Sequence, residues 1–417
     1  MAIRFKGSLG KEGNVSDRKL KLGFIGLGQA TSKVMERLYE IRTLPYIIAD
    51  ACDRRPHALD AFAKEFGGKV FDDVEEMCRK SDVDVVYIAT PAEFHREHVE
   101  IAARYGKHIV VEKPMSLSLA DCEAMIAVTE KAGVKMLAGH THSFDAPMRK
   151  MRSIIRSGEI GEVVMINSWN FNEFNHRSRL SSELRTTRGP ILNQGPHQVD
   201  VVRQLGGGMV KTVRAKAIKD SLSGCEGGYS CFLEFDNGAP ATLVYDGRSF
   251  FDTAELFWWV GEGGTPRPPD TNSKRRQSYR RFAALSREEM EQNLEREKEN
   301  GRYGAADKRP MYEAGGPSAH QPFFGLTVVS CDRGAMRQSK DGLIVYGEDG
   351  PKEIPIEKEL HGRAAELREI YGGIVENRPI FHDGRWAMAT LEVCLAIADS
   401  VNESKEIKLT RQVPIGD

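Results

Sequence analysis

The sequence lacks three features that would narrow its class at once: paired cysteine motifs, a surplus of one charge, and long apolar runs. Its seven cysteines are scattered and form no C-x-x-C pair, which argues against a metal site or disulfide framework and favours a reduced, cytoplasmic setting. The 59 basic and 60 acidic residues nearly cancel, so nonspecific binding to nucleic acid or an anionic membrane is not expected. No run of about 18 apolar residues predicts a transmembrane helix, and the first residues hold no signal-peptide core.

What is present is a chain long enough for two domains. Its 417 residues are 40% hydrophobic and 29% charged, as in ordinary globular proteins. Residues 1–19 are polar and predict a flexible tail. Residues 20–142 alternate short apolar runs with helical patterns, which predicts an α/β domain whose parallel sheet is covered on both faces.

Residues 143–417 follow a different pattern. A helix ending at Gly158 is followed by strand-like stretches, including "AELFWWVG" at 254–261, which predicts a mostly antiparallel sheet. Residues 262–322 are rich in proline and charge and hold one charged helical segment, "SREEMEQNLEREKENG". We interpret this stretch as a surface insertion or a flexible lid.

A nucleotide-binding turn is predicted directly after the first strand. Gly26 and Gly28 permit a tight turn and a close approach to a pyrophosphate, and Gln29 and Ala30 open the helix whose first N–H groups face that anion. Thr31 replaces the third glycine of the usual motif, so the turn alone is only moderately specific.

Asp53 ends the second strand, where a carboxylate accepts hydrogen bonds from ribose hydroxyls. This favours NAD, because a carboxylate repels the 2′-phosphate of NADP. Arg54 and Arg55 follow immediately and are suited to clamp that phosphate, so NADP stays possible.

Further cofactor contacts are expected where the third and fourth strands end. Thr90 and Pro91 close the third strand at the carboxyl edge of the sheet, and His95 is either a cofactor contact or the exposed start of a helix. "VVEKPM" places Glu112 and Lys113 at the end of the fourth strand. A lysine there lies near the nicotinamide and can hold or relay a hydroxyl proton.

The stretch "GPILNQGPHQVD" carries a histidine in polar company. Asn193, Gln194 and Gln198 surround His197, so the histidine does not fit the pattern of a core residue. Together, Gly26-x-Gly28, Glu112-Lys113-Pro114 and the turn with Gly195, His197 and Asp200 resemble the glucose–fructose oxidoreductase/inositol dehydrogenase/MocA family.

This resemblance implies a Rossmann NAD(P)-binding domain followed by an α/β domain with an open antiparallel sheet. It also implies oxidation or reduction at a carbinol or carbonyl carbon, with Lys113 and His197 in catalysis, and a homodimer or homotetramer built on the open sheet. Many sugar-oxidising members carry an aspartate where this chain has Asn193. An amide cannot act as a carboxylate base, which weakens a polyol-dehydrogenase interpretation.

Longer segments, among them "GHTHSFDAPM" and "HDGRWAMATLEVCLA", resemble phthalate 4,5-cis-dihydrodiol dehydrogenases and their relatives. This resemblance favours a small anionic substrate, a cyclohexadiene diol that is oxidised to a catechol without a metal. His140 and His142 either face the substrate or are structural. Four arginines are suited to bind substrate carboxylates, or lie in a solvated loop or a subunit interface: Arg177, Arg179, Arg185 and Arg188.

Two alternatives stay open. One is a sugar, polyol or glycoside dehydrogenase of the same family, and the other is a noncatalytic NAD-binding regulator on the same fold. Trp169, Phe171 and Phe174 either form an apolar wall for the substrate or belong to the core.

Overall fold

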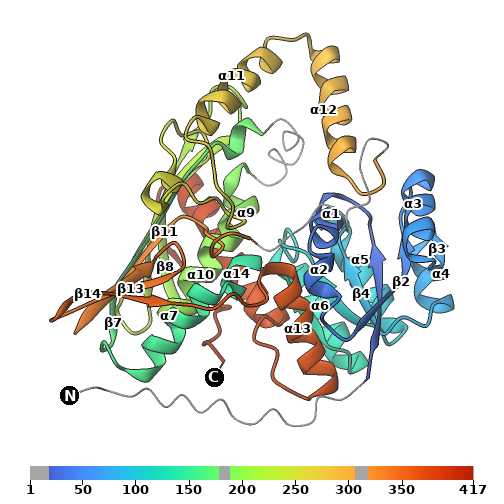
Figure 1. Ribbon diagram of the computed structural model, residues 1–417, viewed down its shortest axis with the longest axis horizontal. Coiled ribbons are helices and arrows are strands. Elements are labelled where there is room, and N and C mark those ends of the chain that lie inside the picture. Colours follow the sequence, from blue (N-terminus) through green and yellow to red (C-terminus); the bar gives the residue numbers. More distant parts are fainter. Residues whose placement is uncertain (1–17, 178–187, 306–317, 417) are drawn as a thin grey trace.

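The computed structural model describes residues 18–177, 188–305 and 318–416, arranged as two sheet-based units that lie side by side (Figure 1). The predicted tail at 1–19 lies almost wholly outside these residues. Among the helices of the described ranges, none combines the length and apolar character needed to cross a membrane.

The first unit is a six-stranded sheet in which every pairing is parallel, in the order β3-β2-β1-β4-β5-β6. Its strands are β1 Leu20–Ile25, β2 Tyr46–Cys52, β3 Val70–Phe71, β4 Val85–Ile88, β5 His108–Val111 and β6 Met136–Ala138. All four residues of β4 are buried, as expected for a strand covered on both faces. The prediction of a Rossmann domain is confirmed, with the two-residue β3 as an addition.

Six helices connect these strands: α1 Gln29–Met35, α2 Leu38–Ile41, α3 Pro56–Phe66, α4 Val74–Lys80, α5 His95–Arg104 and α6 Leu119–Ala132. Polar caps fix where α4 and α6 begin, since Asp73 accepts a hydrogen bond from the Glu76 N–H and Ser118 accepts one from the Asp121 N–H. The strand order reverses between β1 and β4, and ligands of such sheets bind at the carboxyl ends of the strands at this reversal.

The second unit is a nine-stranded sheet in the order β14-β13-β12-β11-β7-β10-β9-β8-β15. Only the β7–β10 pairing is parallel, so the expected mostly antiparallel sheet is confirmed. Its strands are β7 Val163–Phe171, β8 Val210–Lys219, β9 Glu226–Phe235, β10 Pro240–Asp246, β11 Leu326–Cys331, β12 Gly334–Gln338, β13 Gly342–Gly347, β14 Gly350–Pro355 and β15 Ile407–Lys408.

Helices cover one face of this sheet (Figure 1). They are α7 Ala146–Ser157, α9 Pro190–Asn193, α10 Gly195–Gly206 and α14 Gly384–Glu403. Gly158 is the C-cap of α7, at the position where the sequence predicts the helix to end. The opposite face leaves large apolar side chains exposed, among them Trp169 on β7 and Phe232 on β9.

The strand predicted at 254–261 is wrong. Thr253–Phe257 forms a 3-10 turn instead, and Trp258 and Trp259 both take left-handed backbone angles. The side chain of Asp252 accepts a hydrogen bond from the Ala254 N–H at 2.9 Å, which favours the turn over an extended strand.

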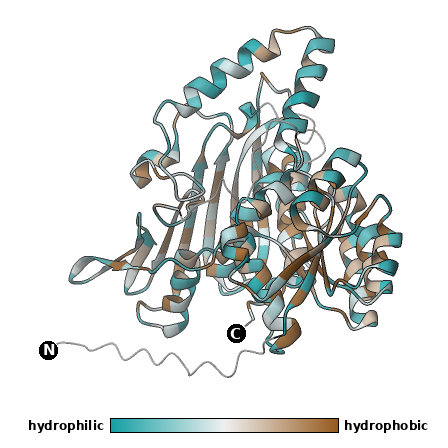
Figure 2. Ribbon diagram, turned by 45° about the vertical axis from the view of Figure 1, so that its right-hand side comes forward, coloured by the Kyte–Doolittle hydropathy of each residue, from teal (hydrophilic) through white to brown (hydrophobic). Residues whose placement is uncertain are grey.

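In its described residues, 262–305 and 318–322, the predicted insertion holds two helices rather than the one expected, α11 Thr271–Ala283 and α12 Arg287–Gly301. We call residues 271–305 the arm. It arches from the second unit to the first, and Figure 2 shows that both helices are mostly hydrophilic. Ser286 and Glu289 form a capping box that begins α12.

One helix of the predicted second domain returns to the first. Buried side chains of α13 Gly362–Val375, including Leu367 and Ile370, join the same apolar cluster as Leu20 and Tyr87 of the parallel sheet. The Rossmann unit is therefore completed by residues from late in the chain.

Candidate active site

The predicted nucleotide-binding turn has the geometry that a dinucleotide requires. Gly26 has a φ of +90°, and a methyl group there would lie 3.0 Å from the carbonyl oxygen of Ala89. At Gly28 the nearest atom to such a methyl group is 3.7 Å away, so the glycine leaves the approach to α1 open. The side-chain nitrogen of Gln29 is buried without a hydrogen-bond acceptor in the described residues. These features fit a pyrophosphate held at the turn.

Asp53 closes this turn from β2. Its carboxylate accepts from the Leu27 N–H at 2.6 Å and from the Arg55 N–H at 2.9 Å. The two neighbouring arginines differ, since Arg54 is exposed whereas Arg55 donates to the Leu27 carbonyl at 2.6 Å. Arg55 therefore lies against the nucleotide-binding turn, and a contact of Arg54 with the cofactor stays a prediction.

His95 joins the two loops at the ends of β4 and β5. Its Nε2 lies 2.8 Å from the Thr90 carbonyl and its Nδ1 lies 3.1 Å from the Met115 carbonyl. The side chain is buried, so the expectation of an exposed helix start is wrong. Burial lowers the pKa of His95 although both carbonyls favour the charged form. The residue positions the Thr90–Pro91 turn, and its predicted contact with the cofactor stays a prediction.

Glu112 anchors the end of β5. Its carboxylate accepts from the Tyr87 hydroxyl at 2.8 Å and from Arg363 Nε of α13 at 2.9 Å. Burial alone raises the pKa of Glu112. The positive charges of Arg363 and Lys113 lower it by more than burial raises it, so the carboxylate is ionised. Glu112 thus binds α13, and the half-buried Lys113 follows it in the motif.

Lys113 reaches across to the second unit. Its Nζ donates to the Asn193 carbonyl at 2.9 Å and lies 3.5 Å from the side-chain Oδ1. The Lys113–Pro114 peptide bond is cis. The same Oδ1 accepts from the Gln194 amide at 2.9 Å, so the amide that replaces the family's aspartate is held from two sides.

His197 lies in the first turn of α10 beside His142 and Phe324. The His142 and His197 rings meet edge to face at 5.1 Å, and Phe324 stacks on His142 at 4.4 Å. His142 Nδ1 lies 3.0 Å from the carboxylate of Asp145. The structure therefore gathers two of the predicted histidines and one aromatic ring at one place.

The proton-bearing atoms of His197 can be assigned from its neighbours. Burial lowers the pKa of His197 well below its usual value, and the charge of Lys113 lowers it further, so the ring is neutral at neutral pH. Its Nδ1 lies 3.4 Å from the His140 carbonyl, which favours the proton on Nδ1. Nε2 is then a proton acceptor. His140 contributes this carbonyl, while its own Nδ1 lies 3.1 Å from the Ala138 carbonyl.

Asp200, the last residue of the predicted histidine turn, forms hydrogen bonds with α14. Its carboxylate accepts from the Trp386 indole N–H at 2.5 Å and from the Thr390 hydroxyl at 3.0 Å, both on α14. It fixes α10 on α14 and so orients the helix that carries His197.

The structure describes two of the four arginines predicted to bind substrate carboxylates, and both are paired with glutamates. Arg177 pairs with Glu173 at 3.0 Å and lies 3.7 Å from Glu262. Arg188 pairs with Glu226 at 3.1 Å. Arg179 and Arg185 lie outside the described residues. The aromatic side chains nearby are divided, since Phe174 is core whereas Trp169 is 40% exposed on the open sheet face.

Three residues that build the site were not expected from the sequence. One is Phe324, which follows the insertion, and the two phenylalanines of "QPFF" at this point are the signal that could have indicated it. Asp145 and Arg363 had no signal, because only the fold brings them to His142 and Glu112.

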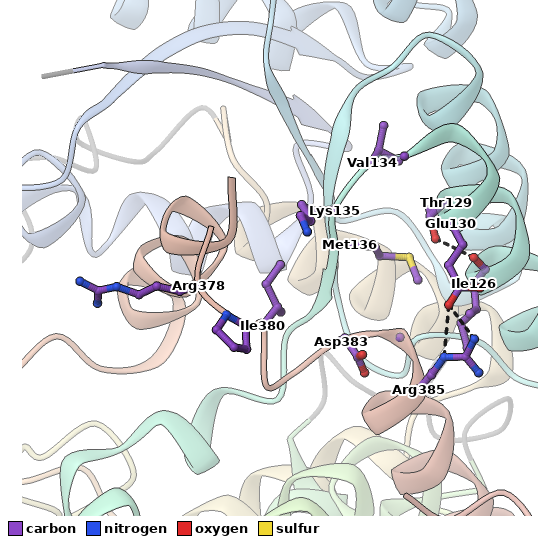
Figure 3. Close-up of a pocket in the computed structure, with 13 residues that line it drawn as sticks. Ile126, Thr129, Glu130, Val134, Lys135, Met136, Arg378, Ile380, Asp383 and Arg385 are labelled. Carbon is purple, nitrogen blue, oxygen red and sulfur yellow. Dashed lines mark hydrogen bonds and ion pairs between the residues drawn. The ribbon is translucent and has the colours of Figure 1, made fainter. Parts of the chain in front are cut away.

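Figure 3 shows a cavity of about 400 Å³ that lies elsewhere. Val134 and Met136 line it at the start of β6, and Glu130 pairs with Arg385 at 2.6 Å beside it. Because parallel strands begin at the edge opposite their carboxyl ends, this cavity lies away from Lys113 and His197.

A glycine turn at the switch point of a parallel sheet, with a lysine and a neutral histidine beside it, defines an NAD-dependent oxidoreductase. Two family profiles match the chain: "Oxidoreductase family, NAD-binding Rossmann fold" over residues 20–140 and "GFO/IDH/MocA C-terminal domain" over residues 148–266. The chain belongs to the Gfo/Idh/MocA family of oxidoreductases and is an NAD-dependent dehydrogenase acting on CH–OH donors.

A curated relative from Comamonas testosteroni is named 1-carboxy-3-chloro-3,4-dihydroxycyclo hexa-1,5-diene dehydrogenase. It is 33% identical over 392 residues, which covers 91% of this chain and 94% of the relative. A crystal structure of a putative dehydrogenase from Bordetella bronchiseptica RB50 is 34% identical with a TM-score of 0.83, covering 94% of this chain and 100% of that one.

A more distant structure shares the fold alone. It is an oxidoreductase from Agrobacterium radiobacter in complex with NAD+, L-tartaric acid and magnesium. The identity is 19% and the TM-score 0.67, over 94% of this chain and 98% of that one.

Proposed function

We propose that the protein is a cis-dihydrodiol dehydrogenase that oxidises a carboxylated cyclohexadiene diol to a catechol. The observation that carries this proposal is the surface beside His197, where Phe324 stacks on His142 at 4.4 Å and lies 5.4 Å from the His197 ring. A flat, unsaturated ring packs well against such aromatic faces. A sugar or inositol presents hydroxyls around its whole edge and needs more polar partners than these rings supply.

The proton-handling residues suit an alcohol donor. A substrate hydroxyl between Lys113 and His197 gives its proton to the neutral His197 Nε2, while Lys113 stabilises the negative charge that develops on the oxygen. Bound NAD+ supplies the hydride acceptor. His142, fixed by Asp145, holds the His197 ring from its edge.

The oxidation balances as the loss of one hydride and one proton. The carbinol C–H bond breaks toward the nicotinamide, the O–H proton goes to His197, and a ketone remains. The neighbouring carbinol carbon then loses its proton and the ketone oxygen gains one, which gives the catechol. Formation of the aromatic ring favours this direction.

The carboxylated nature of the substrate is supported by the name of the Comamonas testosteroni relative. Arg177 is divided between Glu173 and Glu262, so a substrate carboxylate has to compete with these groups for it. Recognition of the substrate carboxylate therefore needs its own comparison, between a diol that carries the carboxylate and one that does not.

The test measures NADH formation at 340 nm with three donors at equal concentration. They are a carboxylated cyclohexadiene cis-diol, the same diol without the carboxylate, and myo-inositol. The proposal expects the highest kcat/KM for the carboxylated diol and a catechol as product. Faster turnover of myo-inositol than of either diol would contradict it.

A further inference from the structure

The arm ends on the nucleotide-binding turn. The Tyr303 N–H donates to the Leu27 carbonyl at 3.2 Å, and Leu27 is the residue between Gly26 and Gly28. The Tyr303 side chain is buried, and its ring packs edge to face on Phe62 of α3. Figure 1 shows α12 descending toward α1 and α3. The contact brings the last turn of α12 beside the strand end that carries Asp53.

Glu299 is the residue of the arm that meets the cations of this turn. Its Oε1 accepts from Arg55, 244 residues earlier in the chain, at 3.0 Å. The same oxygen lies 2.9 Å from His57 Nε2. Burial alone raises the pKa of Glu299. Hydrogen bonds and charge from His57, Arg302 and Arg55 together lower it by more than burial raises it, so the carboxylate is charged at neutral pH.

The Arg55 guanidinium is shared between two carboxylates and a carbonyl. Its Nε donates to Asp53 at 3.0 Å, one terminal nitrogen donates to Leu27 at 2.6 Å, and the other donates to Glu299. Its side chain is 18% exposed. Each of the three guanidinium nitrogens therefore has an acceptor within the chain, and two of these acceptors are carboxylates.

An arginine at this position is the residue type that accommodates the 2′-phosphate of NADP. Such a phosphate needs donors that are free to turn toward it, and it is repelled by nearby carboxylates. Asp53 alone leaves one terminal nitrogen of Arg55 for that role. Glu299 occupies this nitrogen and adds a second negative charge.

We propose that Glu299 is a cofactor-selectivity residue, which holds the Arg55 guanidinium from the arm and thereby makes the site prefer NAD to NADP. This role concerns NAD binding, which the family establishes, and does not depend on the diol substrate. Glu299→Gln keeps the size of the side chain but removes its charge. We expect it to tighten NADP+ binding about tenfold while NAD+ binding changes less than about threefold, as for one partly screened charge contact.

The experiment measures dissociation constants for NAD+ and NADP+ by titration calorimetry on the full-length protein without substrate. Glu297→Gln is the matched control, because it removes the same charge from an exposed position of the same helix. Glu299→Gln is also made in an Arg55→Gln background, where the gain in NADP+ affinity has to disappear if Arg55 is the phosphate ligand.

Three results would overturn the proposal: equal changes for both dinucleotides, the same gain in Glu297→Gln, or a gain that persists without Arg55. Because no substrate is present, a failed diol assay leaves this test intact, and the two proposals fail separately.

Discussion

Lys113 donates from its Nζ to the main-chain oxygen of Asn193 at 2.9 Å, and this bond joins the end of β5 in the first unit to α9 in the second. The acceptor is a carbonyl, which carries no proton and no full charge. The position of Lys113 relative to His197 is therefore set by the packing of the two units against each other.

Replacing Lys113 by Met removes the charge that stabilises the developing alkoxide. We expect kcat to fall about 100- to 1,000-fold, as for other electrostatic contributions to a transition state. Stopped-flow or steady-state NADH absorbance measures it. Lys113→Arg is the matched control and restores part of the rate. Equal activity of Lys113→Met and the wild type would remove Lys113 from the mechanism.

Replacing Asn193 by Asp puts a carboxylate in place of the amide whose Oδ1 lies 3.5 Å from Lys113 Nζ, four residues before His197 in the chain. A negative charge favours protonated imidazole, so the pKa of His197 rises toward its usual value. Since catalysis needs neutral His197, the acidic limb of the pH profile of kcat/KM should move to higher pH. Asn193→Ser, which adds no charge, should leave this limb in place. A limb that moves equally in both variants would contradict the assignment of His197 as the base.

His382 should contribute stability mainly at low pH. Its Nδ1 lies 3.1 Å from Glu369 and its Nε2 lies 3.8 Å from Asp200, and although burial lowers the pKa of His382, these carboxylates raise it more. A raised folded-state pKa gives stability that is fully present below the unfolded value of 6.5 and is lost as pH rises through the folded value.

His382→Gln should therefore reduce the free energy of unfolding by about 3 kcal/mol at pH 6 and by less at pH 9. Urea unfolding of both proteins at the two pH values measures the difference. His320→Gln is the control, because His320 is paired with Asp341 near the surface, where such pairs contribute less than about 1 kcal/mol. A penalty that grows with pH would show that His382 is neutral in the folded protein.

The open face of the nine-stranded sheet should be a contact between copies of the chain. Trp169 is 40% and Phe232 45% exposed, and both lie on strands that pair with β10. An apolar patch of this kind typically marks an interface. The double variant Trp169→Lys/Phe232→Lys should sediment as a monomer, whereas Ile47→Lys, an equally exposed residue of the other unit, should not change the assembly. A monomeric wild-type protein would contradict this prediction.

The parallel sheet could be predicted because its strands are continuous apolar runs separated by amphipathic helices. Within the arm, the charged segment that forms α12 is predicted as a helix, but α11 could not be, since its sequence "TNSKRRQSYRRFA" has no apolar period that would distinguish a helix from a solvated loop. The strand predicted at "AELFWWVG" failed for the opposite reason. Its aromatic residues favour a strand, but the local hydrogen bond of Asp252 begins a turn there.

At the site, the sequence located the groups that carry chemistry but not their partners. Lys113 and His197 stand in recognisable motifs. The charged side chains that form ion pairs with residues of the site come from distant segments. Arg363 pairs with Glu112, and Glu299 pairs with Arg55. Such partners depend on tertiary packing and leave no local pattern.

The packing of α13 on the parallel sheet also bears on how the protein is made. Leu367 and Ile370 share a core with Leu20 and Tyr87, although more than 200 residues separate β6 from α13. A ribosome releases the strands of the nucleotide-binding half long before the helix that completes it. During that interval the apolar surface that α13 covers is exposed to solvent, so the nucleotide-binding half cannot complete its core until α13 has been synthesised.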